Sequence, residues 1–351
     1  MTNSNNNKPV TSSLSSLPDS PEKLNQLRIK HTRIAQIMVE LDTLIYPESQ
    51  DSILLVCGPS GVGKSTLARH MVDNTLKNAM AQMDSDAGLI PAVYVEAPSS
   101  GENDFSWRLF YQRILHQLEG ELGMPKSDYG IDTTTGRLVR PHGASGNSLA
   151  ALRTAVERGL RARGTRFLVI DEAAHIIRQT RRNRLEIQLD TLKSLANECG
   201  TQMILVGSYD LYQLVSLSGQ LARRTHVLHF ERYRQDNDAD MRAFQSCVQK
   251  FQDALPHLWG KELVQHTAAL LENTLGCVGT LSAVLTRAAM LAQQDKRWTV
   301  DALRRALLTE AQRKQILEEI IDGESAINPG LTRTMPRAQN KPVPRQNRSV
   351  A

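Results

Sequence analysis

Short apolar runs alternate with amphipathic segments along most of the chain. Large apolar residues recur every three or four positions over residues 22–45, which predicts a long amphipathic helix. Compact apolar runs predict buried strands at residues 52–58, 91–97, 166–173, 201–208 and 226–233. Helical spacing separates these runs at residues 64–80, 105–122, 148–164 and 175–198. Strands that alternate with helices predict an α/β fold with a five-stranded parallel sheet flanked by helices.

The regions on either side of this alternation have other patterns. Residues 236–322 show helical spacing almost throughout, which predicts a C-terminal helical lid domain after an α/β domain at residues 21–235. Residues 1–20 are rich in Ser, Asn and Pro, and residues 323–351 combine prolines with basic side chains, so we expect two disordered tails. Residues 123–146 are rich in Gly, Asp, Thr and Pro and predict a long loop.

Composition narrows the class of protein. Apolar residues make up 40% of the 351 residues and aromatic ones only 5%, so aliphatic side chains must fill the core. The sequence has no uninterrupted apolar stretch of about 18 residues and no signal-peptide pattern at its start, so we expect a cytoplasmic protein without a membrane partner. The four cysteines, none at CxxC spacing, are expected to be reduced and buried.

The net charge of +5 is concentrated in the C-terminal tail. Residues 325–351 include five basic residues and no acidic residue, which accounts for the whole excess. The remainder of the chain is close to neutral. The charge therefore does not by itself indicate a nucleic-acid-binding surface on the folded body.

The segment after the first predicted strand matches the phosphate-binding pattern G-x-x-x-x-G-K-[ST]. Glycines let backbone N–H groups turn toward phosphates, a lysine adds charge at the β- and γ-phosphates, and a hydroxyl binds Mg²⁺. The candidate nucleotide-binding residues are Gly58, Pro59, Ser60, Gly61, Val62, Gly63, Lys64, Ser65 and Thr66. Because a strand enters this segment and a helix leaves it, we interpret it as a P-loop for ATP and Mg²⁺ rather than a glycine turn before an ordinary helix.

A pair of acidic residues ends the predicted strand RFLVIDEA at 166–173. Asp171 emerges at the carboxyl edge of the sheet, where its carboxylate, with the Ser65 hydroxyl, can hold Mg²⁺ and its water shell. Glu172 is the candidate to polarise an attacking water. The pair favours an ATP hydrolase over a small-molecule kinase. The alternative is a buried strand that ends in two exposed carboxylates.

Three further polar features allow more than one interpretation. Ser208 ends another predicted strand and is either a γ-phosphate contact or a turn residue. Arg223 and Arg224 precede the last strand, too far along the sheet for their own nucleotide, and either reach a neighbouring subunit's phosphates or pair with surface carboxylates. Four arginines within seven residues either contact DNA or a neighbouring subunit or form a solvated face: Arg178, Arg181, Arg182 and Arg184.

Together these motifs resemble those of AAA+ ATPases, and more narrowly those of the TniB and TnsC regulators of transposition. The resemblance extends from about residue 31 to residue 292. Its most specific segments are LLVCGPSGVGKSTLARH, FLVIDEAAHI, LDTLKSLANECGTQMILVGSYDL, SGQLARRTHVLHF and GCVGTLSAVLTRAAMLA. The chain departs from the pattern at the last segment, because many AAA+ proteins have a nucleotide-sensing arginine there and this chain has none before Arg287.

The resemblance implies roles for the candidate residues and partners for the chain. The roles are nucleotide and Mg²⁺ binding for Lys64 and Ser65, metal binding and catalysis for Asp171 and Glu172, a sensor for Ser208, and a finger acting on a neighbour for Arg223 or Arg224. Such proteins form rings or helical filaments on double-stranded DNA when ATP is bound, with about six or seven subunits per turn. They connect a TniQ-type target selector to a DDE transposase in bacterial cells. We identify no DDE nuclease pattern here, so the resemblance implies regulation rather than DNA cleavage.

Two other functions share the P-loop core. One is a nucleotide-switched scaffold that binds only proteins, of the secretion or signalling type. A peptidoglycan-binding or membrane segment would support a secretion role, and repeats or a sensor domain would support a signalling role; the sequence shows none of these. A loader of replication origins usually ends in a winged-helix domain. The roughly thirty residues of helical pattern after Gln293 are too few for such a domain.

Overall fold

The computed structural model describes most of the chain between residues 21 and 327. The described residues are 21, 24, 27–45, 53–99, 104–119, 130–131, 138–139, 148–179, 185–215, 225–259 and 262–327. The predicted N-terminal tail and the tail beyond residue 327 lie outside them, as do residues 180–184 and 216–224.

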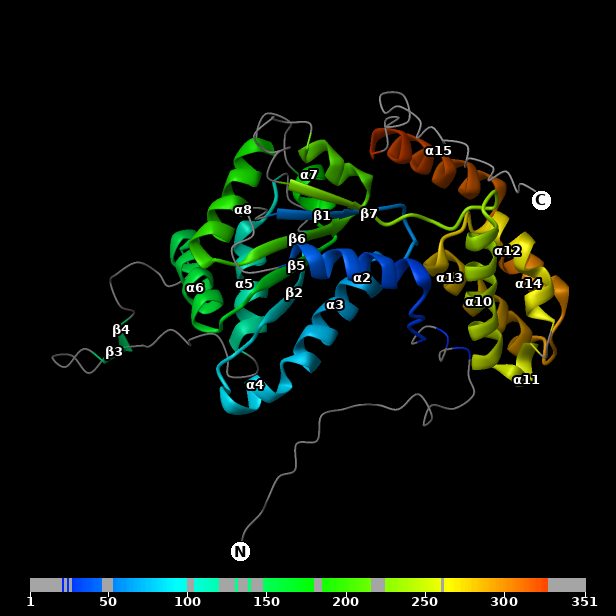
Figure 1. Ribbon diagram of the computed structural model, residues 1–351, viewed down its shortest axis with the longest axis horizontal. Coiled ribbons are helices and arrows are strands. Elements are labelled where there is room, and N and C mark those ends of the chain that lie inside the picture. The colour runs from blue at the N-terminus through cyan, green and yellow to red at the C-terminus, as the bar shows by residue number, and fades with distance from the viewer. Residues whose placement is uncertain are drawn as a thin grey trace, which may run out of the picture.

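Five parallel strands form the central sheet in the order β2-β5-β6-β1-β7 (Figure 1). Their bounds are Ile53–Cys57 for β1, Ala92–Glu96 for β2, Phe167–Asp171 for β5, Gln202–Gly207 for β6 and Thr225–His229 for β7. Strands β1, β5 and β6 are buried along their whole length, as their apolar runs predict. The predicted five-stranded parallel sheet is confirmed. Because the strands are parallel, their carboxyl ends meet at one edge.

Helices cover both faces of this sheet (Figure 1). On one face α2 and α3 pack through Ile34 and Leu67 against Val56 and Val169 of the strands. On the other face α5, α6 and α8 bury a larger set of aliphatic and aromatic side chains. The bounds are Thr32–Leu44 for α2, Lys64–Asn78 for α3, Met80–Ser85 for α4, Trp107–Glu119 for α5, Leu149–Ala162 for α6, Ala174–Arg178 for α7, Leu185–Cys199 for α8 and Tyr209–Leu214 for the 3-10 helix η4.

The C-terminal part of the described chain is helical and has its own core. Side chains such as Phe244, Trp259 and Leu285 are buried together there. The elements are α10 (Asp238–Ala254), α11 (Pro256–Trp259), η5 (Leu263–His266), α12 (Thr267–Asn273), α13 (Val278–Gln294), α14 (Val300–Ala306) and α15 (Glu310–Ile327). Helix α15 returns from this region toward the sheet (Figure 1), and its last residue, Ile327, packs against the sheet's larger core.

Several predicted element boundaries were wrong. The helix expected over residues 22–45 is not continuous, because His31 has extended backbone angles (φ −109°, ψ 167°) and α2 begins only at Thr32. The physical reason is that Leu24 and Ile29 pack into the core of the helical region, whereas Ile34 packs against the sheet. One straight helix cannot deliver both sets of side chains.

Other differences concern segments between and after the predicted helices. The helix expected over 175–198 appears as α7 and α8, with residues 180–184 between them outside the described part. Within the predicted loop, Gly130–Ile131 (β3) and Leu138–Val139 (β4) form a short antiparallel pair. Helix α15 continues to Ile327, past residue 322 where the helical region was expected to end.

Two sequence-based expectations about the class of protein can be compared with the described residues. All four cysteines are free and buried, as expected for reduced thiols. Within the described part of the chain, no helix combines the length and apolar character needed to cross a membrane.

Candidate functional site

The loop between β1 and α3 has the backbone geometry that the glycine motif predicts. Gly61 and Gly63 have φ values of +78° and +114°, in the left-handed region that glycine adopts without steric cost. Helix α3 begins at Lys64, and no side chain caps its first turn. The free N–H groups of this turn and the helix dipole make the loop suited to an anion such as a phosphate.

Lys64 is held at the centre of this loop. Its Nζ donates hydrogen bonds to the carbonyl oxygens of Gly58 and Pro59, at 2.9 and 2.8 Å. Burial lowers the pKa of Lys64, while the negative charges of Glu172, Glu319 and Asp171 act in the opposite direction. The amine therefore lies within electrostatic reach of both carboxylates at the carboxyl end of β5.

The other residues of the motif differ in their exposure. Val62 is buried and belongs to the core between the sheet and α2. Ser65 and Thr66 are half-buried on the first turn of α3, and Ser60 is exposed. The Ser60 hydroxyl donates a hydrogen bond to Glu319 Oε1 of α15 at 3.3 Å. The loop is thus in contact with the C-terminal helix.

Asp171 is buried at the end of β5, with only 3% of its surface exposed. Its Oδ1 accepts a hydrogen bond from the backbone N–H of Glu172 at 2.9 Å, and its Oδ2 accepts one from the Tyr94 hydroxyl at 2.8 Å. Burial raises the pKa of Tyr94 to about 12, so the phenol remains a donor at neutral pH. The arrangement fixes the orientation of the Asp171 carboxylate.

Glu172 has an unusual backbone conformation. Its φ of 51° lies in the left-handed region, which is uncommon for a residue with a side chain and marks local strain. The next residue is fixed, because the Ala173 N–H donates to the Val206 carbonyl of β6 at 3.0 Å. The turn leaves the Glu172 side chain exposed just beyond the strand, whereas Asp171 points inward. One carboxylate is therefore held and the other is free to reach a water.

Ser208 and Arg178 are brought together at the same edge of the sheet. The Ser208 hydroxyl lies 3.2 Å from Asp210 Oδ2, and Arg178 donates to Asp210 at 2.6 Å and to Ser208 at 3.3 Å. Arg178, a candidate DNA contact, is thus ion-paired beside the candidate sensor. The other candidate arginines lie outside the described residues: Arg181, Arg182, Arg184, Arg223 and Arg224.

The phosphate loop is also covered by residues that the sequence did not single out. The backbone N–H of Thr280, on α13, donates to the Gly61 carbonyl at 3.1 Å, and a side chain at Gly279 would meet that same carbonyl at 2.6 Å. His31 lies near Gly63, and its Nδ1 is 2.9 Å from the Tyr233 hydroxyl. Burial lowers the pKa of His31 to about 4. In the sequence, only the small residues Gly279 and Thr280 of GCVGT indicate that α13 could approach the loop. No local pattern indicates the contacts of His31 or Tyr94.

The donor set at this edge fits Mg²⁺. This cation prefers oxygen ligands, keeps several waters and binds through one or two protein groups and substrate phosphates. Ser65 offers a hydroxyl and Asp171 a carboxylate whose two oxygens are each fixed by one hydrogen bond, so further lone pairs remain. Among the described residues, no cluster of three or more His, Cys, Asp or Glu side chains could hold a metal on its own.

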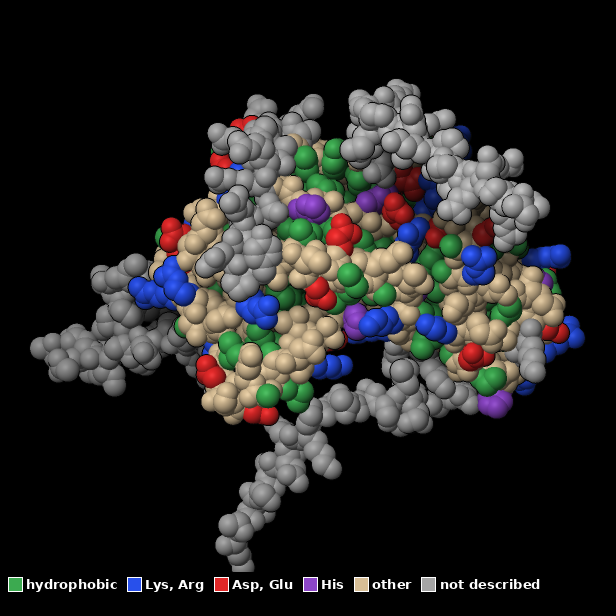
Figure 2. Space-filling view, in the orientation of Figure 1, with side chains coloured by type: hydrophobic (Ala, Val, Ile, Leu, Met, Phe, Trp, Pro, Cys, Tyr) green, Lys and Arg blue, Asp and Glu red, His purple; other side chains and the backbone are tan. Residues whose placement is uncertain are grey.

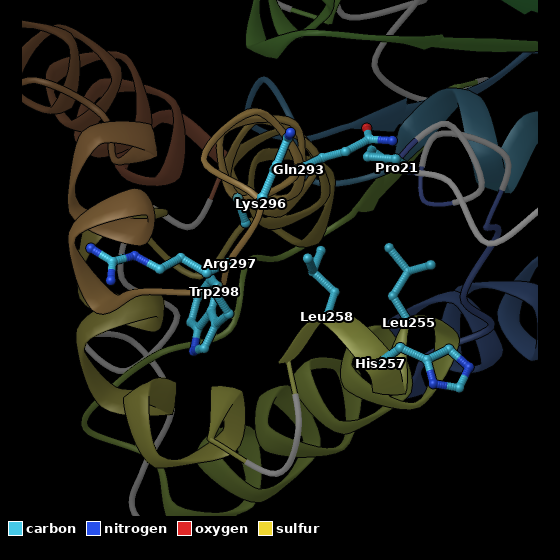
Figure 3. A pocket seen from close by; sticks show the side chains of 9 residues that line it. Pro21, Leu255, His257, Leu258, Gln293, Lys296, Arg297 and Trp298 are labelled. Atoms are coloured by element: carbon cyan, nitrogen blue, oxygen red, sulfur yellow. The ribbon is translucent and has the colours of Figure 1, made fainter.

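A separate hollow of about 300 Å³ lies on the helical region (Figure 3). Leu255 and Leu258 provide apolar surface, and Lys296, Arg297 and Trp298 line another side. The described residues that line it include no carboxylate or hydroxyl. Its described lining shares no residue with the phosphate loop, which remains the candidate site.

Comparisons with known proteins agree with this fold. Residues 47–215 match the family model described as AAA domain. A comparison with curated proteins gives no match. The solved structures that are similar include the ORC2 protein of Aeropyrum pernix, with ADPNP and ADP, at 18% identity and a TM-score of 0.54, covering 80% of this chain and 68% of that one.

Two further structures have the same overall arrangement. The ORC1 protein of Aeropyrum pernix in complex with DNA is 16% identical with a TM-score of 0.54, covering 82% of this chain and 66% of that one. The Walker-type ATPase PABY2304 of Pyrococcus abyssi is 13% identical with a TM-score of 0.50, covering 92% and 81%. At these identities the likeness shows the fold alone. Residues 47–215, which include the phosphate loop and both carboxylates, therefore match the AAA-domain model, and the solved structures show that the chain shares their P-loop fold.

Proposed function

We propose that this chain is an ATP-dependent, DNA-binding AAA+ regulator of transposition that acts in the bacterial cytoplasm. In this proposal it oligomerises on double-stranded DNA and connects a TniQ-type target selector to a DDE transposase. The observation that carries the ATPase part is the meeting of Lys64, Asp171 and Glu172 at the carboxyl edge of one parallel sheet. The AAA-domain match supports nucleotide hydrolysis in general terms. The transposition part rests on the resemblance of the quoted segments to TniB and TnsC.

Each residue of the site has a defined task in this proposal. The loop N–H groups and Lys64 bind the β- and γ-phosphates, and Ser65 and Asp171 hold the magnesium ion. Mg²⁺ supplies positive charge that offsets the charge developing on the phosphate oxygens. Glu172 accepts a hydrogen bond from the attacking water and orients it, because its carboxylate extends past the strand end. Ser208, tied to Asp210, contacts the γ-phosphate or that water.

Oligomerisation completes the site. Arg223 or Arg224 would reach the γ-phosphate of a neighbouring copy, since a guanidinium fork matches phosphate oxygens. A finger that acts between subunits makes hydrolysis depend on assembly.

We also propose the division into an α/β domain at residues 21–235 and a helical lid at residues 236–322, with the lid contacting the loop through Thr280.

DNA binding is proposed for the arginine cluster at 178–184. On the face shown in Figure 2, Lys and Arg side chains are interspersed with Asp and Glu and form no continuous basic patch. Arg178 is already paired with Asp210, which leaves Arg181, Arg182 and Arg184 as the better candidates. The similar ORC1 structure contains DNA, which supports testing duplex DNA as a ligand.

A co-sedimentation experiment with the full chain tests this function. We expect pelleting on double-stranded DNA with a non-hydrolysable ATP analogue, little pelleting with ADP, and capture of the DDE transposase encoded nearby only by the DNA-bound assembly. The matched control is Lys64→Ala, which should stay soluble in all conditions. Nucleotide-dependent assembly that is the same with and without DNA would instead support a scaffold that binds only proteins.

A further inference from the structure

Tyr94 connects the phosphate-loop helix to the buried carboxylate. It lies on the edge strand β2, opposite Val169 and two positions before the residue that pairs with Asp171. Its hydroxyl donates to Asp171 Oδ2 at 2.8 Å. Its ring faces the guanidinium of Arg69, whose Cζ is 5.4 Å from the ring centroid, and Arg69 follows Lys64 on α3. A cation–π contact on one side and a hydrogen bond on the other thus hold the phenol in place.

This contact matters because, among the described residues, the Asp171 carboxylate accepts hydrogen bonds from two donors. The backbone N–H of Glu172 holds Oδ1 and the Tyr94 hydroxyl holds Oδ2. Removal of the hydroxyl leaves one donor, and the carboxylate plane can then rotate about its side-chain torsion. A metal ligand needs a fixed orientation, which neighbours that do not touch the metal commonly provide.

We propose that Tyr94 is a positioning residue that orients Asp171 toward magnesium. The inference rests on the proposed binding of ATP and Mg²⁺ and is independent of DNA and of transposition. Arg69 supports the phenol and does not itself touch the carboxylate in this account.

Binding of a fluorescent ATP analogue tests this inference without any turnover. In Tyr94→Phe, the affinity in EDTA should stay unchanged, while the Mg²⁺ concentration for half-maximal binding should rise about 10- to 100-fold, as loss of one hydrogen bond to a charged group predicts. The matched control is Tyr111→Phe, which removes another buried phenol hydroxyl, on α5. An unchanged Mg²⁺ requirement in Tyr94→Phe, or an equal shift in Tyr111→Phe, would overturn the positioning role. Absence of Mg²⁺-dependent binding in the wild-type chain would instead contradict the proposed function.

Helix α15 gives a second, independent observation at the same site. Glu319, Ile320, Gly323 and Glu324 lie at the three- and four-residue spacing of one helix face, and Ile320 is completely buried. Glu319 accepts a hydrogen bond from Ser60, and Glu324 is ion-paired with Arg232 at 2.9 Å. Gly323 packs so closely on the ring of Tyr209, the residue after Ser208, that a Cβ there would collide with it.

The acidic face of α15 therefore lies against the loop that is suited to phosphates. Glu319 accepts a hydrogen bond from Ser60 of the loop, and its negative charge acts to raise the pKa of Lys64. A nucleotide phosphate bound there would experience repulsion from the Glu319 carboxylate at short range. By thermodynamic reciprocity, a helix position that weakens nucleotide binding is itself weakened when nucleotide binds.

We infer that α15 is a displaceable strap whose Glu319 competes with the nucleotide phosphates for the loop. The inference rests on the proposed nucleotide binding and regulates that same site. In this state α15 lowers the affinity for nucleotide, and bound nucleotide loosens α15 from Ser60 and Tyr209. Any partner that holds α15 away from the sheet would then raise nucleotide affinity.

Titration of a fluorescent ATP analogue against matched variants tests the strap. Glu319→Gln should bind the analogue about threefold to tenfold more tightly, because one like charge is removed. Glu318→Gln, an adjacent glutamate that pairs with Lys314 on the exposed side of α15, should bind as the wild type does. Gly323→Ala should also tighten binding, since its methyl group displaces the helix from Tyr209.

Hydrogen exchange of residues 310–327 provides the second readout. Exchange should become faster when the analogue is added to the full chain. Unchanged nucleotide affinity in both Glu319→Gln and Gly323→Ala, or slower exchange of α15 on nucleotide binding, would overturn the competition. Wild-type protein that binds no nucleotide would contradict the proposed function itself.

Discussion

The phosphate loop and the surfaces that cover it are built in different ways. The loop from Gly58 to Lys64 is one continuous segment whose geometry follows from its own glycines and from the strand and helix that flank it. Its cover comes from distant parts of the chain: the hydrogen bond between Ser60 and Glu319, for example, joins residues 259 positions apart. The type of ligand that the loop suits is thus set by a short local segment. The access of a ligand to the loop depends on contacts between distant parts of the chain.

The largest expected effect on nucleotide affinity concerns the loop itself. Lys64→Ala removes a half-buried charge that is hydrogen-bonded to two loop carbonyls and lies where phosphates would bind. We expect nucleotide affinity to fall by about 100-fold or more, the size expected when charged hydrogen bonds to phosphate are lost. Isothermal titration with ATP and Mg²⁺ measures this effect. Retention of wild-type affinity would place the nucleotide elsewhere.

His31, one of the residues that cover the loop, should make the stability of the fold depend on pH. Burial depresses the pKa of His31 from 6.5 to about 4, so the unfolded chain binds one more proton than the folded chain between these values. The contribution of His31 to the free energy of unfolding is therefore fully present above pH 6.5. It decreases as the pH falls toward 4, by up to about 3 kcal/mol.

Denaturant unfolding between pH 4.5 and 7.5 tests this expectation. His31→Gln should flatten the pH dependence, because the variant side chain does not titrate. His116→Gln, an exposed histidine on α5, is the control and should preserve it. If His31→Gln shows the wild-type slope, the pH dependence originates outside the cover.

A smaller effect should separate two arginines that the sequence placed in one cluster. Arg178 is ion-paired with Asp210 beside Ser208, so Arg178→Ala should change ATP hydrolysis by about twofold to fivefold, as loss of one exposed ion pair predicts. It should leave DNA binding almost unaltered. Arg182→Ala should do the reverse and reduce the slope of log affinity against log salt by about 0.9 on duplex DNA. Equal effects of the two variants on that slope would indicate that Arg178 also contacts DNA.

The same contrast explains what could be predicted from the sequence. Strands β1, β5 and β6 were recognisable because their apolar runs are buried on both faces. The loop and Asp171 were recognisable because phosphate and metal binding need particular residues at fixed spacing. Tyr94, Thr280 and Glu319 were missed because their importance comes from contacts with partners far away in the chain. The helix at residues 22–45 was overextended because periodicity does not show that Leu24 and Ile34 serve different cores.

The most direct test of the central claim is the fate of ATP on Glu172→Gln. The substitution keeps the shape of the side chain and removes the group that accepts a proton from water. We predict that this variant, isolated by rapid gel filtration, retains one ATP per site and hydrolyses it about 10²- to 10⁴-fold more slowly than the wild type, the range expected for loss of a general base. Hydrolysis at the wild-type rate, or loss of ATP binding equal to that of Lys64→Ala, would contradict the assignment of this edge of the sheet as an ATPase site.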